Sequence, residues 1–137
     1  MGYSIATFAI LMIDLNYLKR INDSFGHERG DIYIKKISKI ICDIFAHSPV
    51  YRIGGDEFIV ILENRDLETH DSLIQELKTK MEEIQNDKSL ESWERVSAAV
   101  GLAIYDASKD ENMESVFKRA DKAMYENKKA MKAVRTE

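Results

Sequence analysis

The sequence has little of the chemistry that stabilises small extracellular domains or zinc modules. Its single cysteine, Cys42, lies in an apolar-periodic stretch, which argues against a disulfide framework and indicates a reducing compartment. The three histidines, His27, His47 and His70, lie far apart and lack the spacing of zinc ligands. The chain is therefore neither a disulfide scaffold nor a histidine-based zinc module.

Long hydrophobic runs are also absent. The most apolar run, Ile5–Ile13, has nine residues, about half of what a bilayer-crossing helix needs. The start has no basic stretch and no cleavage site of a secretory signal. Because Met1 is followed almost at once by this run, we expect a piece of a longer protein. We expect a cytoplasmic location, alone or as the cytoplasmic part of a membrane-anchored protein, with no direct membrane contact from this fragment.

The charge balance excludes a further class. The net charge is −4, so the chain lacks the basic excess of a general nucleic-acid-binding surface, and we expect no nucleic-acid partner. The 137 residues, 45% of them apolar and 32% charged, suit one globular domain with one core.

Hydrophobic periodicity predicts four strands. Ile5–Ile13 reads as a buried strand, and Val50–Ile53 and Phe58–Leu62 as the arms of a hairpin around a tight turn. The fourth strand is Val96–Tyr105, where Gly101 indicates close packing or a bulge.

Helical spacing predicts four helices. A short one starts near Asn16 and stops at Gly26, and a polar turn then leads to a helix opened by Asp31. The remaining helices are carried by apolar residues from Leu73 to Ile84 and from Met113 onward. The order β-α-α-β-β-α-β-α predicts an α+β fold: a mainly antiparallel sheet around a central hairpin, covered by helices.

Carboxylates cluster at two predicted strand ends. Asp56 and Glu57 follow Gly54 and Gly55 in the hairpin turn, where glycine leaves room for a partner close to the backbone. An exposed turn explains these residues equally well when they are taken alone.

Asp14 comes directly after the first predicted strand. If that strand neighbours the hairpin, Asp14, Asp56 and the carbonyl of Leu15 form an oxygen set suited to Mg²⁺, with Mn²⁺ also acceptable. The simpler alternative for Asp14 is a cap on the following helix.

Two polar residues flank the first predicted helix-to-helix loop. Asn22 and Asp31 could together read the hydrogen-bonding edge of guanine, with Gly26 and Gly30 shaping the turn between them. Each residue alone fits a helix-end role equally well.

Basic residues could hold phosphates. Lys118 and Lys122 are four apart and share a helix face, and Lys19 follows Asp14 closely. A lysine-rich terminal helix can equally be a solvated surface, and Lys19 an ordinary exposed lysine.

Three separated motifs in this order resemble one family. Gly54-Gly55-Asp56-Glu57-Phe58, the upstream block "DLNYLKRINDSFGHERGD" and the block "FKRADKAMYENK" are similar to the GGDEF domains of diguanylate cyclases. The resemblance spans nearly the whole chain, residues 1–137. It implies a fold like that of nucleotide cyclases and polymerase palms.

The resemblance also implies an activity, the joining of two GTP molecules into cyclic di-GMP by a homodimer of facing domains. It implies that Asp14, Asp56 and the Leu15 carbonyl bind Mg²⁺, with Asp56 as general base and Glu57 beside it. Lys19 would stabilise charge on the phosphates, which Lys118 and Lys122 would contact. The guanine would be read by Asn22 and Asp31, with His27 in the same loop and Gly54 and Gly55 close to the nucleotide.

Four departures from the family pattern are visible. The family's N-terminal helix and D-x-L-T-G-L-x-N-R stretch are missing, so we expect an upstream sensory domain in the full protein and weak activity of this fragment. Residues 45–48 read Phe-Ala-His-Ser in place of the R-x-x-D product site, so product inhibition there is not expected. Asn16 and Ala99 replace the family's Asp and Ser, and residues 131–133 replace G-R-N.

A regulatory module that binds GTP or cyclic di-GMP without catalysis is the alternative, and a scaffold with relic motifs is a third. The complete set Asp14, Asp56 and Glu57 favours the enzyme.

Overall fold

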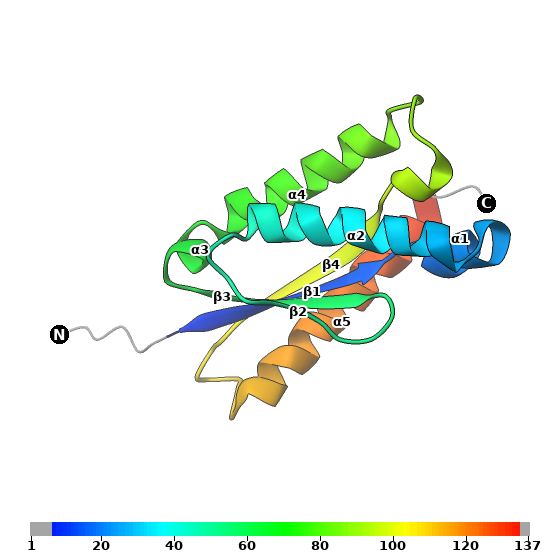
Figure 1. Ribbon diagram of the computed structural model, residues 1–137. Helices are drawn as coiled ribbons and strands as arrows, with labels where there is room; N and C mark the ends of the chain where they lie inside the picture. The colour runs from blue at the N-terminus through cyan, green and yellow to red at the C-terminus, as the bar shows by residue number, and fades with distance from the viewer. Residues whose placement is uncertain (1–6, 135–137) are drawn as a thin grey trace.

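The computed structural model describes residues 7–134, and its centre is a four-stranded sheet (Figure 1). The strand order is β2-β3-β1-β4, and each neighbouring pair is antiparallel. This arrangement confirms the predicted α+β class and the hairpin beside the first strand. The strands are β1 (Phe8–Leu15), β2 (Val50–Arg52), β3 (Glu57–Glu63) and β4 (Ala98–Ile104).

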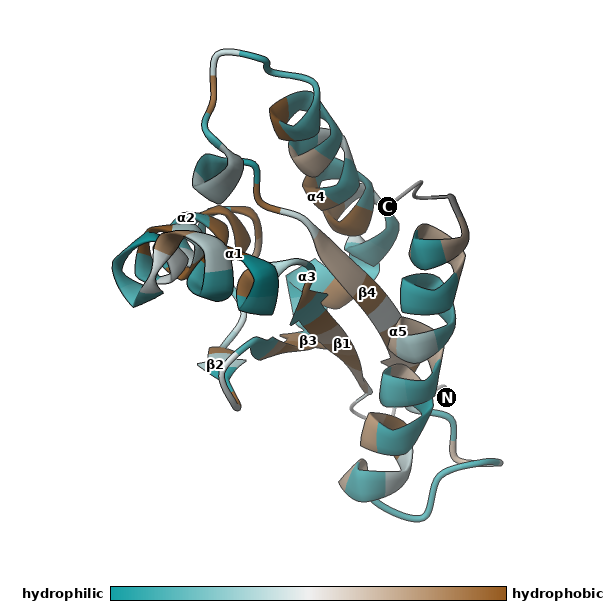
Figure 2. Ribbon diagram, turned by 90° about the vertical axis from the view of Figure 1, so that its right-hand side faces the viewer, coloured by the Kyte–Doolittle hydropathy of each residue, from teal (hydrophilic) through white to brown (hydrophobic). Residues whose placement is uncertain are grey.

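Helices cover both faces of the sheet, with α2 and α4 on one side and α5 on the other (Figures 1 and 2). The short helix α1 connects β1 to α2 beside one end of the sheet. The helical elements are α1 (Leu18–Phe25), α2 (His27–Ile44), α3 (Asn64–Glu68), α4 (His70–Gln85), the 3₁₀ turn η1 (Ser92–Glu94) and α5 (Met113–Val134).

Several predicted boundaries were wrong. The second helix begins at His27 and not at Asp31, so the expected polar turn is only Gly26, whose φ of 90° ends α1. The first strand continues to Leu15 because β3 and β4 pair with it beyond the apolar run. The first two residues of the predicted strand Ile5–Ile13 lie outside the described residues. Neither α3 nor η1 was predicted, since both are too short to show a helical period.

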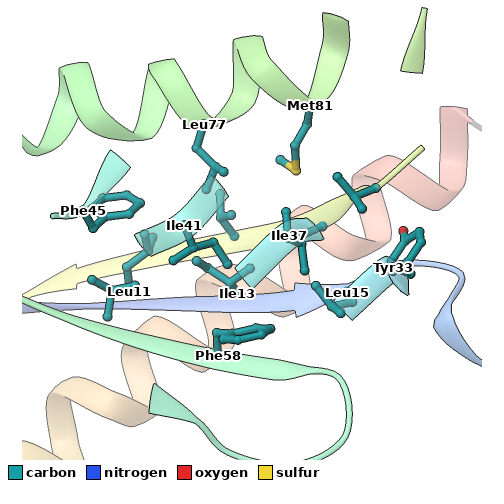
Figure 3. Close-up of a cluster of buried hydrophobic side chains, with 14 of the residues drawn as sticks. Leu11, Ile13, Leu15, Tyr33, Ile37, Ile41, Phe45, Phe58, Leu77 and Met81 are labelled. Atoms are coloured by element: carbon teal, nitrogen blue, oxygen red, sulfur yellow. The ribbon is translucent and has the colours of Figure 1, made fainter. Parts of the chain in front are cut away.

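The larger core lies between the sheet and the pair α2 and α4. Alternate residues of β1 and β3 point into it, including Leu11, Ile13 and Phe58, and meet Ile37 and Ile41 of α2 (Figure 3). Burying such side chains is worth about 1.5–3 kcal/mol each. This core fixes the register of β1 against β3, because a slip of one residue would expose every buried side chain.

On the other face, α5 packs directly on β4. A Cβ on Gly101 would lie 2.1 Å from the backbone nitrogen of Met124 and 2.4 Å from the carbonyl oxygen of Ala120. The predicted close packing at Gly101 is therefore confirmed. This contact determines which residues of α5 reach the end of the sheet where the motif residues gather.

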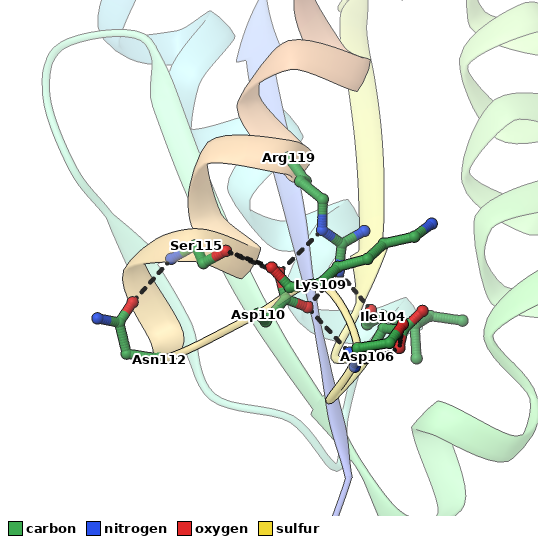
Figure 4. Close-up of polar contacts among 8 residues, drawn as sticks. Ile104, Asp106, Lys109, Asp110, Asn112, Ser115 and Arg119 are labelled. Carbon is green, nitrogen blue, oxygen red and sulfur yellow. Dashed lines mark hydrogen bonds and ion pairs between the residues drawn. The ribbon is translucent and has the colours of Figure 1, made fainter.

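The start of α5 is held by an ion pair (Figure 4). The Asp110 side chain is fully buried, and the Arg119 Nε donates to its Oδ1 at 3.0 Å. Ser115 Oγ donates to the same oxygen at 2.8 Å, and the backbone nitrogen of Asp106 donates to Oδ2 at 2.9 Å. All of these partners hold α5 to the loop that leaves β4.

Candidate active site

The sheet brings the two acidic motifs together. Asp14 is paired with Glu57 across β1 and β3, and the backbone nitrogen of Leu15 donates to the Asp56 carbonyl at 2.8 Å. Asp14 is still within β1, which ends at Leu15 and not at Ile13, so its predicted place directly after the strand was wrong. Its alternative role as a cap was also wrong, because α1 begins at Leu18 and has no side-chain cap.

Ionisation of the carboxylates at this point of the sheet is unfavourable. The Asp14 side chain is 14% exposed, and its Oδ1 is buried without a hydrogen-bond partner among the described residues. Burial raises the pKa of Asp14, Lys128 opposes this, and the charge of Asp56 adds to the rise. Burial and then the charges of Asp14 and Asp56 likewise raise the pKa of Glu57. A concentration of buried, repelling carboxylates is typical of a functional site.

The Lys128 ammonium lies near both the Asp14 carboxylate and the Leu15 carbonyl oxygen. The Lys128 Nζ is 2.8 Å from Asp14 Oδ2 and 3.4 Å from the Leu15 carbonyl oxygen. A carboxylate, a carbonyl and an unpartnered carboxylate oxygen are the donors that Mg²⁺ and Mn²⁺ prefer. The described residues contain no group of three or more His, Cys, Asp or Glu placed around a metal. The set therefore fits a cation that takes its remaining ligands from water and phosphate, as Mg²⁺ does.

A pocket of about 580 Å³ opens beside this pair. It contains the first turn of α1, whose backbone N–H groups have no side-chain cap and so remain available to an anion. Tyr17, with φ of 68°, makes the abrupt change from β1 to α1. The pocket is lined by Leu15, Asn16, Tyr17, Leu18, Lys19, Arg20, Asp23, Ser24, Asp56, Lys128 and Lys132.

The structure places Lys19 at this pocket but not Lys118 and Lys122. Lys118 is 73% exposed and pairs with Glu114. Lys118 precedes Lys128 by ten residues, which separates the two lysines by about 15 Å along the helix. Lys128 and Lys132 have the same spacing of four and do line the pocket. Sequence reasoning missed them because spacing alone does not tell which turn of a long helix reaches the site.

The two predicted guanine readers lie on neighbouring helices. The Asn22 side chain packs against Gly30, where a Cβ would lie 1.7 Å from Asn22 Oδ1. Gly30 therefore lets α2 approach Asn22, and it directly precedes Asp31, which is exposed. His27 is exposed at the first position of α2 and does not line the pocket.

The hairpin turn is open on its outer side. Gly54 has φ of 119°, which other residues adopt only with strain, and a Cβ on Gly55 would meet nothing within 4 Å. The Arg52 guanidinium donates to the Gly55 carbonyl at 2.9 Å and so fixes the turn. Sequence reasoning did not identify this role of Arg52.

A buried network supports the end of β1 that carries Asp14 and Leu15. The Tyr33 hydroxyl donates to the Asn16 carbonyl at 2.6 Å and accepts from the Ser97 backbone nitrogen at 2.9 Å. Asn16 also donates through Nδ2 to Ser97 Oγ at 3.0 Å. These bonds join α2, the end of β1 and the start of β4 directly behind Asp14 and Leu15. Nothing in the sequence pattern indicated this role of Tyr33.

Residues 3–133 match the sequence model of the family described as "Diguanylate cyclase, GGDEF domain". The chain therefore belongs to the GGDEF domain family, and the resemblance seen in its motifs is confirmed.

Individual relatives agree with this assignment. Diguanylate cyclase A of Treponema denticola is 35% identical over 127 residues, which cover 89% of this chain and 33% of the relative. The chain thus spans about a third of that relative's length. No helix of residues 7–134 is both long and apolar enough to span a membrane.

Solved structures share the fold. The active GGEEF domain of a diguanylate cyclase from Vibrio cholerae superposes with a TM-score of 0.77 at 27% identity, covering 91% of this chain and 78% of that one. The coiled coil and GGDEF domain of DgcB from Caulobacter crescentus, in complex with c-di-GMP, gives 0.77 at 23% identity, with 91% and 66% covered. The latter shows likeness of fold alone.

Proposed function

We propose that this domain is a diguanylate cyclase that condenses two GTP molecules into cyclic di-GMP and two pyrophosphates. The observation that carries the proposal is the meeting of Asp14, Asp56 and Lys128 at the mouth of a pocket that begins with the uncapped start of α1. A triphosphate in that pocket would meet lysines, backbone N–H groups and a metal-binding oxygen set together.

Each residue group has a distinct task in this reaction. Asp14, Asp56 and the Leu15 carbonyl would hold Mg²⁺ or Mn²⁺, which supplies Lewis-acid polarisation of the phosphate and lowers the pKa of a bound hydroxyl. Lys19, Lys128 and Lys132 balance the charge of the phosphates. Lys128, which pairs with Asp14, would contact the phosphates in place of Asp14 if these oxygens held a metal ion.

The acidic pair also handles the proton. The ribose 3′-hydroxyl of one GTP attacks the α-phosphorus of the other, and the bond from that phosphorus to pyrophosphate breaks as the new one forms. We assign the acceptance of the released proton to Asp56 and Glu57, which lie beside Asp14 across β1 and β3. The raised pKa of Glu57 makes its carboxylate a better proton acceptor than an exposed one.

The reaction needs two copies of the domain. One domain binds one GTP, so the attacking hydroxyl and the phosphate face each other only when two domains meet around a two-fold axis. We therefore propose a homodimer, brought together by an upstream domain in the full protein.

Feedback by product at the family's R-x-x-D position is not part of this proposal. Phe45 at its first position is fully buried in the core, and Ser48 at its last position donates to Asp66. These residues therefore serve the fold.

The decisive experiment is product identification. The domain, fused to a parallel coiled coil, is given GTP and Mg²⁺, and the nucleotides are weighed by mass spectrometry. Cyclic di-GMP with pyrophosphate, lost in Asp56→Asn, is the expected result. GTP binding without any product would instead identify the regulatory module, the alternative in which Lys128 holds the metal-binding oxygens permanently.

Guanine recognition has a test of its own. Asp31→Ser removes the carboxylate that would accept from N1–H and N2–H₂ of guanine, so the preference for GTP over ATP should fall by about 10-fold or more. Competition binding of the two nucleotides measures it. Unchanged selectivity would show that Asp31 does not recognise guanine, and would contradict the proposed joint recognition by Asn22 and Asp31.

A further inference from the structure

A second cavity, which we name the arginine cavity, lies beside α1. It has a volume of about 380 Å³ and is lined by residues of α1, by the last residue of α4 and by the segment that carries η1. Helix α1 and η1 lie side by side in both ribbon views (Figures 1 and 2). Arg20, Arg95, Tyr17 and Phe25 are among its lining residues. Nothing in the proposed cyclase reaction uses Arg95 or Phe25.

The arginine cavity is distinct from the active-site pocket. Asp56, Lys128 and Lys132 line only the active-site pocket, while Phe25 and Arg95 line only the arginine cavity. The two share one wall of α1 residues, including Arg20. Ligands in the two sites would therefore be separated by these shared residues of α1.

The charge of the cavity is opposite to that of the chain. The chain has a net charge of −4, yet the cavity is lined by two guanidinium groups and, among the described residues, by no carboxylate. The Nε of Arg95 is buried and has no hydrogen-bond partner among the described residues. A buried donor on a cation that lacks an acceptor is costly, and an anionic ligand would supply that acceptor.

Arg95 is held in place by its backbone. The Gln85 side-chain amide donates to the Arg95 carbonyl at 2.7 Å and to the Val96 carbonyl at 3.1 Å, which ties the segment to α4. The opposite wall is also braced, since Phe25 packs edge-on against Trp93 with ring centroids 5.0 Å apart. Arg29 covers the Trp93 ring at 4.4 Å. The walls are thus preformed, which lowers the entropic cost of binding.

The geometry points to a binding site for a phosphomonoester carried on a ring, the chemistry shared by nucleoside monophosphates and sugar phosphates. Guanidinium groups bind phosphate through paired N–H donors, and Ser24 and Ser92 line the cavity as further donors. A volume of about 380 Å³ exceeds what a phosphate alone fills and lies in the usual range for small-molecule pockets. The rings of Tyr17 and Phe25 would contact the remainder of the ligand.

The chain contains its own reporter for this site. Trp93 is the only tryptophan, and it follows Ser92 and touches Phe25, both lining residues. Its fluorescence is recorded while GMP, ribose 5-phosphate or inorganic phosphate is added in EDTA, so that metal-dependent binding at the active site is suppressed. No turnover is measured, so the outcome is independent of whether the domain is a cyclase.

We expect saturable changes with GMP or ribose 5-phosphate, at concentrations lower than those needed with inorganic phosphate. Arg95→Gln should weaken binding by at least about 10-fold, because it removes a charged donor pair. The affinity of Arg95→Lys should lie between those of the unaltered chain and Arg95→Gln, since lysine keeps the charge and loses the paired donors. Circular dichroism confirms that each variant is folded.

Two variants serve as controls. Arg65→Gln removes an exposed arginine that does not line the cavity, and Lys128→Gln changes only the active-site pocket. Both should bind as the unaltered chain does. The inference is overturned if none of the three probes gives a saturable signal, if folded Arg95→Gln binds unchanged, or if Lys128→Gln abolishes binding. Equal affinity for inorganic phosphate and GMP would overturn the assignment of a ring-bearing ligand.

Discussion

Two buried carboxylates, each paired with a basic residue of α5, differ in almost everything else. Asp110, at the start of α5, receives hydrogen bonds from Arg119, Ser115 and a backbone nitrogen. These bonds, with Arg119 the largest influence, hold its pKa well below the usual range. Asp14, near the end of α5, has one cation and one oxygen without a partner, and its pKa is raised.

The difference separates a structural ion pair from one to which we assign a function. At Asp110 the fold satisfies the charge, so ionisation stabilises the folded state. At Asp14 the cost of burying the charge exceeds the stabilisation by Lys128, so ionisation of Asp14 destabilises the folded state. A further cation near Asp14 would stabilise it. Charges that a fold leaves unsatisfied are where a ligand or metal can contribute most.

The largest expected effect is on activity at Asp14. If Asp14 is a metal ligand as we propose, Asp14→Asn should lower cyclic di-GMP formation by about 10³-fold or more, because it removes that ligand's charge. Its free energy of unfolding should change by less than about 1 kcal/mol, since the lost pairing with Lys128 is offset by the removal of a poorly solvated charge. Product assays and chemical denaturation measure the two quantities. A large loss of stability would contradict this prediction and show that Asp14, like Asp110, stabilises the fold.

The next effect compares two lysines of α5. Lys128→Gln should lower turnover by about 10–100-fold, because one charge at the phosphates and the partner of Asp14 are lost. Lys118→Gln, in an exposed pair with Glu114, is the matched control and should change activity by less than about twofold. Equal losses of activity in the two variants would show that Lys118 also contacts the phosphates.

Asp110 should respond in stability and not in chemistry. Since its folded-state pKa lies below the unfolded value, its contribution is present above pH about 4 and is lost as pH falls further. Asp110→Asn should therefore lower the melting temperature by several degrees at pH 7 and much less in strong acid, with little change in product formation. A melting difference independent of pH would show that the charge of Asp110 does not matter.

The smallest effect concerns the network behind the site. Tyr33→Phe removes one donor and one acceptor and should cost about 1–3 kcal/mol of stability, because the Asn16 carbonyl and the Ser97 nitrogen keep their buried positions. Denaturation measures the loss. If the network also positions the metal-binding strand, half-maximal activity will require more Mg²⁺. Ser97→Ala, which keeps the Tyr33 bonds, should leave that Mg²⁺ requirement unchanged.

Much of the fold followed from patterns that local chemistry produces. Alternating and continuous apolar residues predicted four strands, and Gly26 predicted the end of α1 because its φ suits glycine. The start of α2 was missed because "HERG" has no apolar period to separate it from a turn. The short helix α3 was missed because five residues are too few to show a helical period.

The meeting of the acidic residues was predicted, whereas only Lys19 of the three predicted lysines lies at the pocket. Asp14, Asp56 and Leu15 meet because strand pairing brings two strand ends together, which a sequence pattern can anticipate. The lysines depend on where α5 crosses the sheet, and Lys118 with Lys122 and Lys128 with Lys132 have the same spacing. Only the close packing of α5 on Gly101 determines which pair reaches the pocket.

The sequence by itself determined the family, the sheet with its glycine turn, and the acidic residues at that turn, because these depend on residue type and short-range spacing. The tertiary structure decided which lysine joins Asp14, how Tyr33 braces the strand behind it, and that Arg95 and Phe25 border one cavity. These are contacts between segments far apart in the chain, and they depend on how helices pack on the sheet, which no local pattern records.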